Sequence, residues 1–365
     1  MAGSTFGTNF KIMTWGESHG PALGVTIDGC PAGLSLAVSD IRKFLNRRKP
    51  GQSDITTSRQ EDDEVTILSG VFAGVTTGAP ISLMVKNTAQ RSADYTEIAN
   101  YYRPGHADFT FETKYGFRDY RGGGRSSGRE TVSRVAAGAV AVKILNELGV
   151  NFLSYTHSIG IVGIDKAKFD PALIGKTKTL MPDEEADREA LKLISACLER
   201  HDSIGGVVEC RINGLPPGIG EPVFSKLDAL LSHAIMSIGA VKAVEIGAGT
   251  GAALAYGSEN NDEFIYTNAS IRKRTNHSGG ILGGISDGDE IILRAHIKPT
   301  PSIAQTQLTV DKSGQEIPVN IKGRHDPIIV PRAVVVVEAM AALTVLDLMM
   351  INMSSRLDRL IDFYC

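Results

Sequence analysis

The feature that most constrains the fold of this chain is an internal repeat: three segments recur in the same order. The pairs are GVTIDGCPAGL (24–34) with VECRINGLPPGI (208–219), ILSGVFAG (67–74) with ILGGISDG (281–288), and SRVAAGAVAVKIL (133–145) with PRAVVVVEAMAAL (331–343). The first two pairs show the alternation and turn residues of strands, and the third shows apolar helices. Three matches in one order make chance a poor explanation.

The repeat predicts two halves of βαββα character, roughly 1–150 and 200–365, that pack about a pseudo-twofold axis. We expect a single α+β domain over 1–365, with sites formed between the halves. Two separate homologous domains are the alternative, but few residues resemble a flexible linker. The charged stretch 165–194 reads as a connecting loop and a surface helix.

Composition excludes some classes of partner. With 42% apolar residues the 365-residue chain can bury a large core, and its formal net charge is only −3. No whole-molecule attraction to nucleic acid or an anionic membrane follows, so any anion site must be a local cluster of cations.

Cysteine usage and apolar runs indicate a cytoplasmic protein. Cys30, Cys197, Cys210 and Cys365 are scattered without metal-ligand spacing, so we expect reduced thiols and no metal site. The first residues lack the apolar run of a secretory signal. The apolar stretch 331–353 contains acidic residues, so it reads as a buried helix and not as a membrane span.

The segment 118–149 concentrates positive charge at the start of a predicted helix that ends before Gly149. Its first 17 residues contain five arginines: Arg118, Arg121, Arg125, Arg129 and Arg134. Ser127 and Glu130 fit a capping box, and a helix N-terminus favours anions, so this segment predicts a phosphate or carboxylate site. A solvated arginine-rich loop is the alternative. GGRSSGRE lacks the lysine and hydroxyl residue of a Walker A loop, which argues against an NTPase.

Two further loops add charge. Arg47, Arg48 and Lys49 end a predicted helix, where cations are common for structural reasons alone. The segment IKGRHDPIIVPR (321–332) precedes an apolar helix and carries Arg324, His325, Asp326 and Arg332 in a short loop. Such a loop is a reasonable candidate for part of a site.

Two histidines lie in glycine-flanked loops beside charged residues. His19 follows Glu17 and Ser18 in TWGESHG, and His106 lies between Arg103 and Asp108. Their surroundings can tune a histidine pKa around neutrality, although either residue alone would more often be structural. Consecutive side chains are expected to diverge, and the GxSxG motif is missing at this loop, so a serine hydrolase triad is disfavoured.

Seven motifs together resemble the chorismate synthase family, in family order and over nearly the whole chain. They are TWGESHG, RRKPGQSDITTSRQEDDE, RPGHADFT, DYRGGGRSSGRETVSRVAAGA, NHSGGILGGISDG, IKPTPSI and GRHDP. The resemblance implies an α+β fold described as a β-α-β sandwich with internal pseudo-twofold duplication, assembled as a homotetramer.

The resemblance also implies a reaction. Family members convert the small molecule 5-enolpyruvylshikimate 3-phosphate to chorismate and phosphate, the last step of the shikimate pathway to aromatic amino acids. This 1,4-anti elimination requires reduced FMN (FMNH2) without net redox change, and NADPH is a candidate indirect reductant. Both substrate and cofactor are anionic, which suits an arginine-rich cavity in a mildly acidic protein.

Residue roles follow from the same resemblance. His19 is placed to protonate the leaving phosphate, His106 to govern the protonation of the reduced flavin, and Asp326 to act with the flavin in removing the C6 proton. The implied substrate-binding residues are Ser18, Arg48, Arg103, Arg129 and Arg324. The implied cofactor-binding residues are Arg48, Arg125, Ser126, Ser127, Gly239, Ala240, Gly283, Lys298, Pro299, Thr300, Pro301, Ser302 and Arg324.

A few positions depart from the family pattern. Asp54 stands where many members have arginine, and Gly239 stands where others have asparagine, which puts one contact at each position in doubt. The chain lacks long insertions and resembles the compact, monofunctional members. An NADPH-dependent flavin reductase is the alternative function, and a noncatalytic module that binds anions or nucleic acid is a third.

Overall fold

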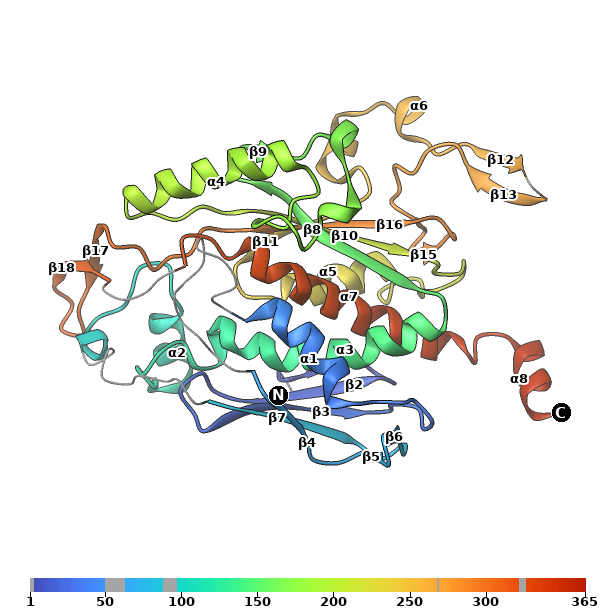
Figure 1. Cartoon of the computed structure of the whole chain (residues 1–365), viewed down its shortest axis with the longest axis horizontal. Helices are drawn as coiled ribbons and strands as arrows, with labels where there is room; N and C mark the ends of the chain where they lie inside the picture. The colour runs from blue at the N-terminus through green and yellow to red at the C-terminus, as the bar shows by residue number, and fades with distance from the viewer. Residues whose placement is uncertain (1–2, 50–62, 88–96, 268, 322–325) are drawn as a thin grey trace.

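The structure, a computed structural model, describes residues 3–49, 63–87, 97–267, 269–321 and 326–365. It has three layers: Figure 1 shows one sheet below, a second sheet above, and helices between them. The apolar faces of both sheets turn toward the helices, so one continuous core fills the middle of the molecule. The predicted α+β composition is confirmed.

The N-terminal sheet is antiparallel and has the strand order β1-β2-β3-β7-β4. Its strands are β1 (Thr5–Phe6), β2 (Lys11–Gly16), β3 (Ala22–Asp28), β4 (Val65–Ile67) and β7 (Ile81–Lys86). Alternate residues such as Val25, Ile27 and Leu83 are buried against the helices. This two-residue period is the pattern that predicts these strands from the sequence.

The C-terminal sheet has the order β9-β8-β10-β16-β11. Its strands are β8 (Asn151–Ile159), β9 (Val162–Gly163), β10 (Gly206–Asn213), β11 (Val241–Ile246) and β16 (Ile291–Ile297). The first repeated segment forms most of β3 and of β10, and the second repeated segment precedes β7 and β16. In each sheet these two strands, β3 with β7 and β10 with β16, are hydrogen-bonded neighbours. Strand β8 belongs to this sheet although it lies between the two ranges expected for the halves.

The middle layer consists of α1 (Val38–Arg48), α3 (Thr131–Glu147), α5 (Leu227–Met236) and α7 (Val330–Asn352). Helices α3 and α7 approach closely because Gly138 faces Ala339: a Cβ added at Gly138 would lie 2.3 Å from the Cβ of Ala339. Small residues permit such a contact.

Helix α7 is the one helix of the described residues with enough length and apolar character to cross a membrane, and 83% of its apolar window is buried inside the molecule. It is therefore a core helix, as predicted. Its acidic residues are satisfied internally. Glu338 binds the guanidinium of Arg47 at 2.8 and 2.7 Å, and Asp347 accepts backbone N–H groups of the segment 8–10.

The remaining elements lie around this sandwich. They are α2 (Asp108–Tyr115), α4 (Glu184–Glu199), α6 (Gly257–Asn260), α8 (Leu357–Tyr364), β5 (Val71–Phe72), β6 (Val75–Thr76), β12 (Phe264–Thr267), β13 (Ser270–Lys273), β14 (Ile281–Leu282), β15 (Ile285–Ser286), β17 (Thr306–Val310) and β18 (Glu316–Asn320). Helix α4, capped by Asp183, is the surface helix predicted for the charged stretch.

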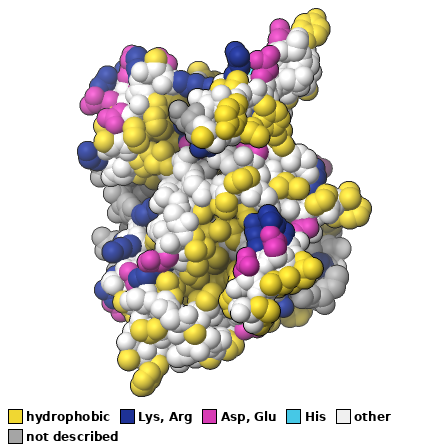
Figure 2. Space-filling view, turned by 90° about the vertical axis from the view of Figure 1, so that its right-hand side faces the viewer, with side chains coloured by type: hydrophobic (Ala, Val, Ile, Leu, Met, Phe, Trp, Pro, Cys, Tyr) yellow, Lys and Arg dark blue, Asp and Glu magenta, His cyan; other side chains and the backbone are white. Residues whose placement is uncertain are grey.

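The end of the molecule at the right of Figure 1 exposes apolar side chains, and Figure 2 shows this end in space-filling form. Helix α8 and the β12–β13 hairpin project here from the body of the molecule. Their exposed side chains include Phe264, Tyr266, Ile271, Leu357, Phe363 and Tyr364. Exposed apolar groups at this density are typical of a surface that contacts another molecule.

Candidate active site

The loop that carries His19 follows strand β2 and is fixed by Asn87, the residue after β7. The Asn87 side-chain amide donates to the carbonyl oxygens of Glu17, at 3.1 Å, and Gly20, at 2.7 Å. Within this turn the Ser18 hydroxyl lies 3.1 Å from Nδ1 of His19. The expectation that these consecutive side chains diverge is therefore wrong, because the turn brings both to one side.

The arginine-rich loop packs directly against His19. Gly122 has φ +118°, and a Cβ added there would lie 2.5 Å from the imidazole. Only glycine combines this backbone conformation with such a close approach. The loop at 118–126 and the loop at 17–20 are thus brought into contact although they are distant in the sequence.

A buried carboxylate, Asp63, joins two of the predicted substrate-binding arginines. One oxygen accepts from Arg48 at 3.2 and 2.8 Å, and the other binds Nη1 of Arg129. The side chains of Asp63 and Arg48 are each 1% exposed and that of Arg129 is 9% exposed. Although burial raises it, the pKa of Asp63 is held below its usual range by Arg48 and Arg129.

This charge network continues to Asp326. The carboxylate of Asp326 accepts from Arg332 at 2.6 Å, and Arg332 also donates to the backbone carbonyl of Arg48 at 3.2 Å. Asp326, Arg48 and Arg129, all predicted site residues, therefore lie in one set of contacts. Arg324 and Asp54 lie outside the described residues.

His106 begins a second group of contacts, with the segment after β16. Its Nδ1 lies 2.9 Å from the carbonyl oxygen of Pro104, and its Nε2 lies 2.8 Å from the Ser302 hydroxyl. Because a carbonyl only accepts, Nδ1 carries the proton and Nε2 accepts from Ser302 when the ring is neutral. Burial, reinforced by Arg103, lowers the pKa of His106 to about 4. The prediction of a pKa near neutrality is therefore wrong for His106.

Other predicted cofactor residues gather around His106. Lys298 donates from Nζ to the carbonyl of Gly105 at 3.1 Å, and its backbone N–H donates to Ala240 at 2.9 Å. Arg103 forms a bidentate pair with Asp108, with both bonds at 2.8 Å. The structure thus brings 239–240 and 298–302 to the loop that carries His106.

Gly283 lies elsewhere. It occupies the tight turn between β14 and β15, with φ +61°. In Figure 1 this hairpin lies toward the right of the long axis, whereas α2, which follows His106, lies at the left. The structure therefore does not bring Gly283 to the other predicted cofactor residues of the same chain.

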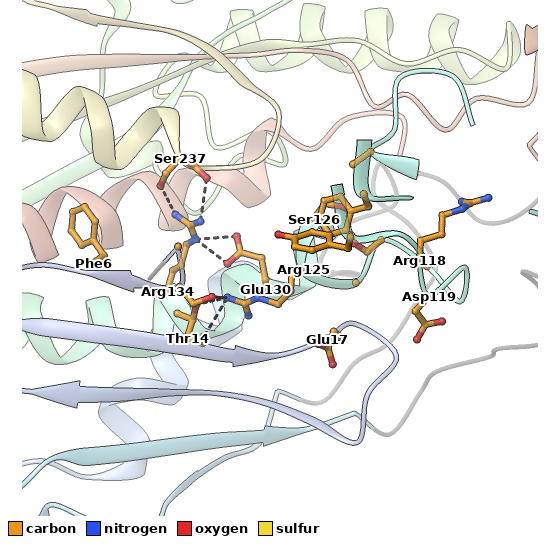
Figure 3. Close-up of a pocket in the computed structure, with 18 of the residues that line it drawn as sticks. Phe6, Thr14, Glu17, Arg118, Asp119, Arg125, Ser126, Glu130, Arg134 and Ser237 are labelled. Atoms are coloured by element: carbon orange, nitrogen blue, oxygen red, sulfur yellow. Dashed lines mark hydrogen bonds and ion pairs between the residues drawn. The ribbon is translucent and has the colours of Figure 1, made fainter. Parts of the chain in front are cut away.

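The five clustered arginines do not converge on one anion site. Arg118 binds Asp108 at 2.9 Å, Arg121 binds Asp119, and Arg125 donates to the Thr14 hydroxyl at 2.6 Å. Figure 3 shows Arg125 against Thr14, and Arg134 between Glu130 and Ser237. The single site predicted for this segment is therefore divided among several neighbourhoods.

The predicted capping box is also wrong. The Ser127 hydroxyl accepts from the N–H of Arg129, at 3.3 Å, within a 3₁₀ turn that precedes α3. The Glu130 carboxylate binds Arg134 instead of returning to the backbone of Ser127. The 3₁₀ turn delays the start of the α-helix to Thr131 and separates the arginines.

A cavity of about 760 Å³ lies beside these loops (Figure 3). Its lining includes Thr14, Glu17, Ala107, Asp108, Arg125 and Ser126, so it touches the neighbours of both His19 and His106. Cavities of this size accommodate cofactors and drug-sized molecules.

Two residues of the network were missed by sequence reasoning. Asp63 lies in a run of acidic residues, EDDE, and Asn87 ends an alternating strand pattern. Neither pattern indicates a partner, because Asp63 and Arg129 are 66 residues apart. Asp63 lies within the family motif at 47–64, which was the signal available for it, whereas Asn87 lies in none of the seven family motifs.

Known proteins are similar to this chain in sequence and in fold. The chorismate synthase family model matches residues 10–350. The chain is 64% identical to chorismate synthase of Lachnospira eligens, with 100% of both chains covered, and 55% identical to that of Methanocella arvoryzae, with 96% and 95% covered.

A solved structure described as a crystal structure of chorismate synthase superposes with a TM-score of 0.76 at 30% identity, covering 98% of each chain. Sequence and fold thus agree over nearly the full length. The chain belongs to the chorismate synthase family, whose members are carbon–oxygen lyases acting on phosphates.

Proposed function

We propose that this protein converts 5-enolpyruvylshikimate 3-phosphate to chorismate and phosphate by a 1,4-anti elimination that depends on reduced FMN. The observation that carries the proposal is the continuous set of contacts from the His19 loop through Asn87, Arg129, Asp63 and Arg48 to Arg332 and Asp326. It places a candidate acid, anion-binding groups and a candidate base in one region.

Arg48 and Arg129 bind the anionic substrate. Both guanidinium groups bind the carboxylate of Asp63, which holds the two cations side by side at the edge of the site. A positive charge in a partly dry site attracts carboxylates and phosphate more strongly than it would in water. Arg103 and Arg324 complete the proposed substrate contacts, although Arg103 also pairs with Asp108.

His19 donates a proton or a hydrogen bond to the leaving phosphate. Since its Nδ1 faces the Ser18 hydroxyl, we assign Nε2 to the phosphate oxygen, with Ser18 beside it at the substrate. Charge develops on the phosphate as the C3–O bond breaks, and a positioned donor lowers the energy of that state. Asp326 receives the proton that C6 loses.

The residues after β16 fit the phosphate-bearing cofactor. Lys298 supplies an ammonium group, and within the part of the chain that is described the buried Oγ1 of Thr300 has no hydrogen-bond partner. The Ser302 hydroxyl already donates its proton to Nε2 of His106, so it is not counted among the donors. These donors suit a phosphate. When bound, reduced FMN supplies electron density for the elimination without net redox change.

The remaining proposed cofactor contacts are Arg48, Arg125, Ser126, Ser127, Gly239, Ala240, Gly283, Pro299, Pro301 and Arg324. His106, neutral at physiological pH, orients Ser302 and offers no positive charge to the flavin region. NADPH acts only as an indirect reductant.

We also propose a homotetramer in the cytoplasm, built from single-domain chains whose halves are related by a pseudo-twofold axis. The same order of four strands in each sheet, β2-β3-β7-β4 and β8-β10-β16-β11, supports the axis. The exposed apolar side chains of α8 and β12–β13 support association, and Gly283 would then contact a cofactor held by another copy. The four free cysteines are consistent with a reducing compartment.

The test is anaerobic release of phosphate from the substrate with chemically reduced FMN. We expect one phosphate for each chorismate formed and no turnover with oxidised FMN. Flavin binding without phosphate release would overturn the proposal. NADPH oxidation by the purified protein would instead favour a flavin reductase, and anion binding without either reaction would favour a binding module.

A further inference from the structure

We propose that Asn87 is a positioning residue that fixes the position of His19 relative to Arg129. The inference rests on the proposed roles of these two residues in the elimination. Asn87 itself is not assigned to the substrate or the cofactor; it acts through the two groups that its side chain binds.

Both polar atoms of the Asn87 side chain form hydrogen bonds, and their partners lie in two different segments of the chain. Nδ2 donates to the carbonyls of Glu17 and Gly20, which bracket Ser18 and His19. Oδ1 accepts from Nε of Arg129 at 3.1 Å. One amide therefore ties the loop of the candidate acid to a candidate substrate-binding arginine.

The support for Asn87 is rigid. It directly follows β7, which pairs with β3 and β4 within the N-terminal sheet. Its own backbone N–H donates to Pro21 at 3.1 Å, which anchors the far end of the loop. A side chain held this way fixes the position of the loop relative to the sheet.

The opposite sides of both partners are fixed independently. Gly122 limits the movement of the His19 ring, and Asp63 binds the end of the Arg129 guanidinium. The Asn87 side chain lies between His19's loop and Arg129. Its removal would allow these two groups to move relative to each other, while Gly122 and Asp63 would still restrict each of them on the other side. A displacement of about 1 Å in such a site can reduce turnover by about 100-fold.

The first experiment is a double-mutant cycle on turnover, with Asn87→Ala and His19→Ala alone and combined. We expect Asn87→Ala to lower kcat by about 10- to 100-fold in the wild-type background and less than about 3-fold in the His19→Ala background. A purely structural role predicts the same loss in both backgrounds, and that result would overturn the inference. Asn213→Ala, another strand-end asparagine with a side-chain hydrogen bond, is the matched control.

The second variant, Asn87→Asp, separates the two contacts. It keeps an acceptor for Arg129 but loses the donors to the Glu17 and Gly20 carbonyls. We expect kcat to fall while KM stays within about 3-fold of the wild-type value, because substrate binding through Arg129 is retained. Equal changes in kcat and KM for Asn87→Ala and Asn87→Asp would contradict a coupling role. This variant also serves if Asn87→Ala does not fold.

A third measurement does not depend on the reaction. The rate at which diethyl pyrocarbonate modifies His19, followed by mass spectrometry of its peptide, should rise several-fold in Asn87→Ala and stay unchanged in Asn213→Ala. An unchanged rate in Asn87→Ala would refute the inference. If His19→Ala retained full turnover, the proposed role of His19 would fail, and the modification rate would still decide whether Asn87 positions it.

Discussion

Four strands of each large sheet have the same order, β2-β3-β7-β4 and β8-β10-β16-β11, yet the two sheets bury their charges in different places. In the N-terminal half the buried carboxylate Asp63 precedes β4 and binds two arginines at a loop-rich edge. In the C-terminal half the buried carboxylate Glu209 lies within β10 and binds Arg211 and Arg294, at 2.8 and 2.7 Å.

The residues at equivalent positions of β10 and β3 explain why the two sheets bury charge in different places. Glu209 also accepts from the Tyr155 hydroxyl on β8, so three neighbouring strands share one carboxylate. In the N-terminal sheet the corresponding position is Gly24, and the indole of Trp15 lies over it, since an added Cβ would be 2.2 Å from the ring. Of the two buried carboxylates that bind two arginines each, the one among loops is therefore the better candidate for a site, because binding and catalytic residues lie disproportionately on loops.

The largest effect is expected when the buried carboxylates Asp63 and Glu209 are neutralised in turn and both stability and activity are measured. Asp63→Asn removes a buried counter-charge from Arg48 and Arg129, and we expect a loss of about 3 to 5 kcal/mol in the free energy of unfolding together with a higher KM. Glu209→Gln should lower the free energy of unfolding by less, because the side chains of Arg211 and Arg294 are 26% and 18% exposed. It should leave KM unchanged. Denaturant unfolding and steady-state kinetics would measure both. A raised KM in Glu209→Gln would contradict the conclusion that Asp63, and not Glu209, belongs to the candidate site.

The next effect concerns catalysis. His19→Ala should lower turnover by about 100-fold or more, because the leaving phosphate loses its proton donor. His296→Ala is the control from the C-terminal sheet, where the ring lies 3.2 Å from Glu245 and is 37% exposed. We expect wild-type turnover for the control. Near-wild-type turnover in His19→Ala would contradict the assigned role.

A smaller effect concerns the contact that joins the halves. Gly138→Ala places a methyl group against Ala339, and we expect overpacking to cost about 1 to 3 kcal/mol of stability. Gly251→Ala is the control, since nothing lies within 4 Å of an added Cβ there. Thermal unfolding of both variants would test this. Equal melting temperatures would show that α3 and α7 can separate without cost.

The effect that is smallest at neutral pH is a dependence of stability on pH. An unfolded histidine titrates near pH 6.5, whereas the pKa of His106 in the folded protein is about 4. Between these values the unfolded state binds more protons, so stability should fall as the pH falls, by up to about 1.4 kcal/mol per pH unit. The contribution is complete above pH 6.5. Comparing wild type with His106→Asn by denaturant unfolding at pH 4.5, 5.5 and 7 would reveal it; identical profiles would disprove it.

Much of the fold was predictable because its signals are local. The apolar runs at 133–145 and 331–343 predict helices from residue type alone, and both lie in the middle layer as α3 and α7. The alternating segments at 24–34 and 208–219 likewise form most of β3 and β10. The boundary of the second half was less accessible, because β8 joins its sheet through pairing with β10, more than 50 residues further along the chain.

The candidate site was predictable in residue type but not in arrangement. The capping box at Ser127 failed because a 3₁₀ turn competes with the helix start, and local propensity does not resolve that competition. The pKa of His106 differed from expectation because the ring is buried, and burial depends on segments as distant as Ser302, 196 residues away, which the ring contacts. Asp63 and Asn87 escaped notice for the same reason: their partners are distant in sequence.

The sequence by itself determined the family, the kinds of chemical groups present and the apolar segments that must be buried, because these depend on motifs and short-range periodicity. Only the tertiary structure decided which groups meet: Asp63 between two arginines, Asn87 between His19's loop and Arg129, and His106 against Ser302. Packing of the two sheets on the shared helices fixes those contacts. Such long-range pairing carries no short-range pattern in the sequence.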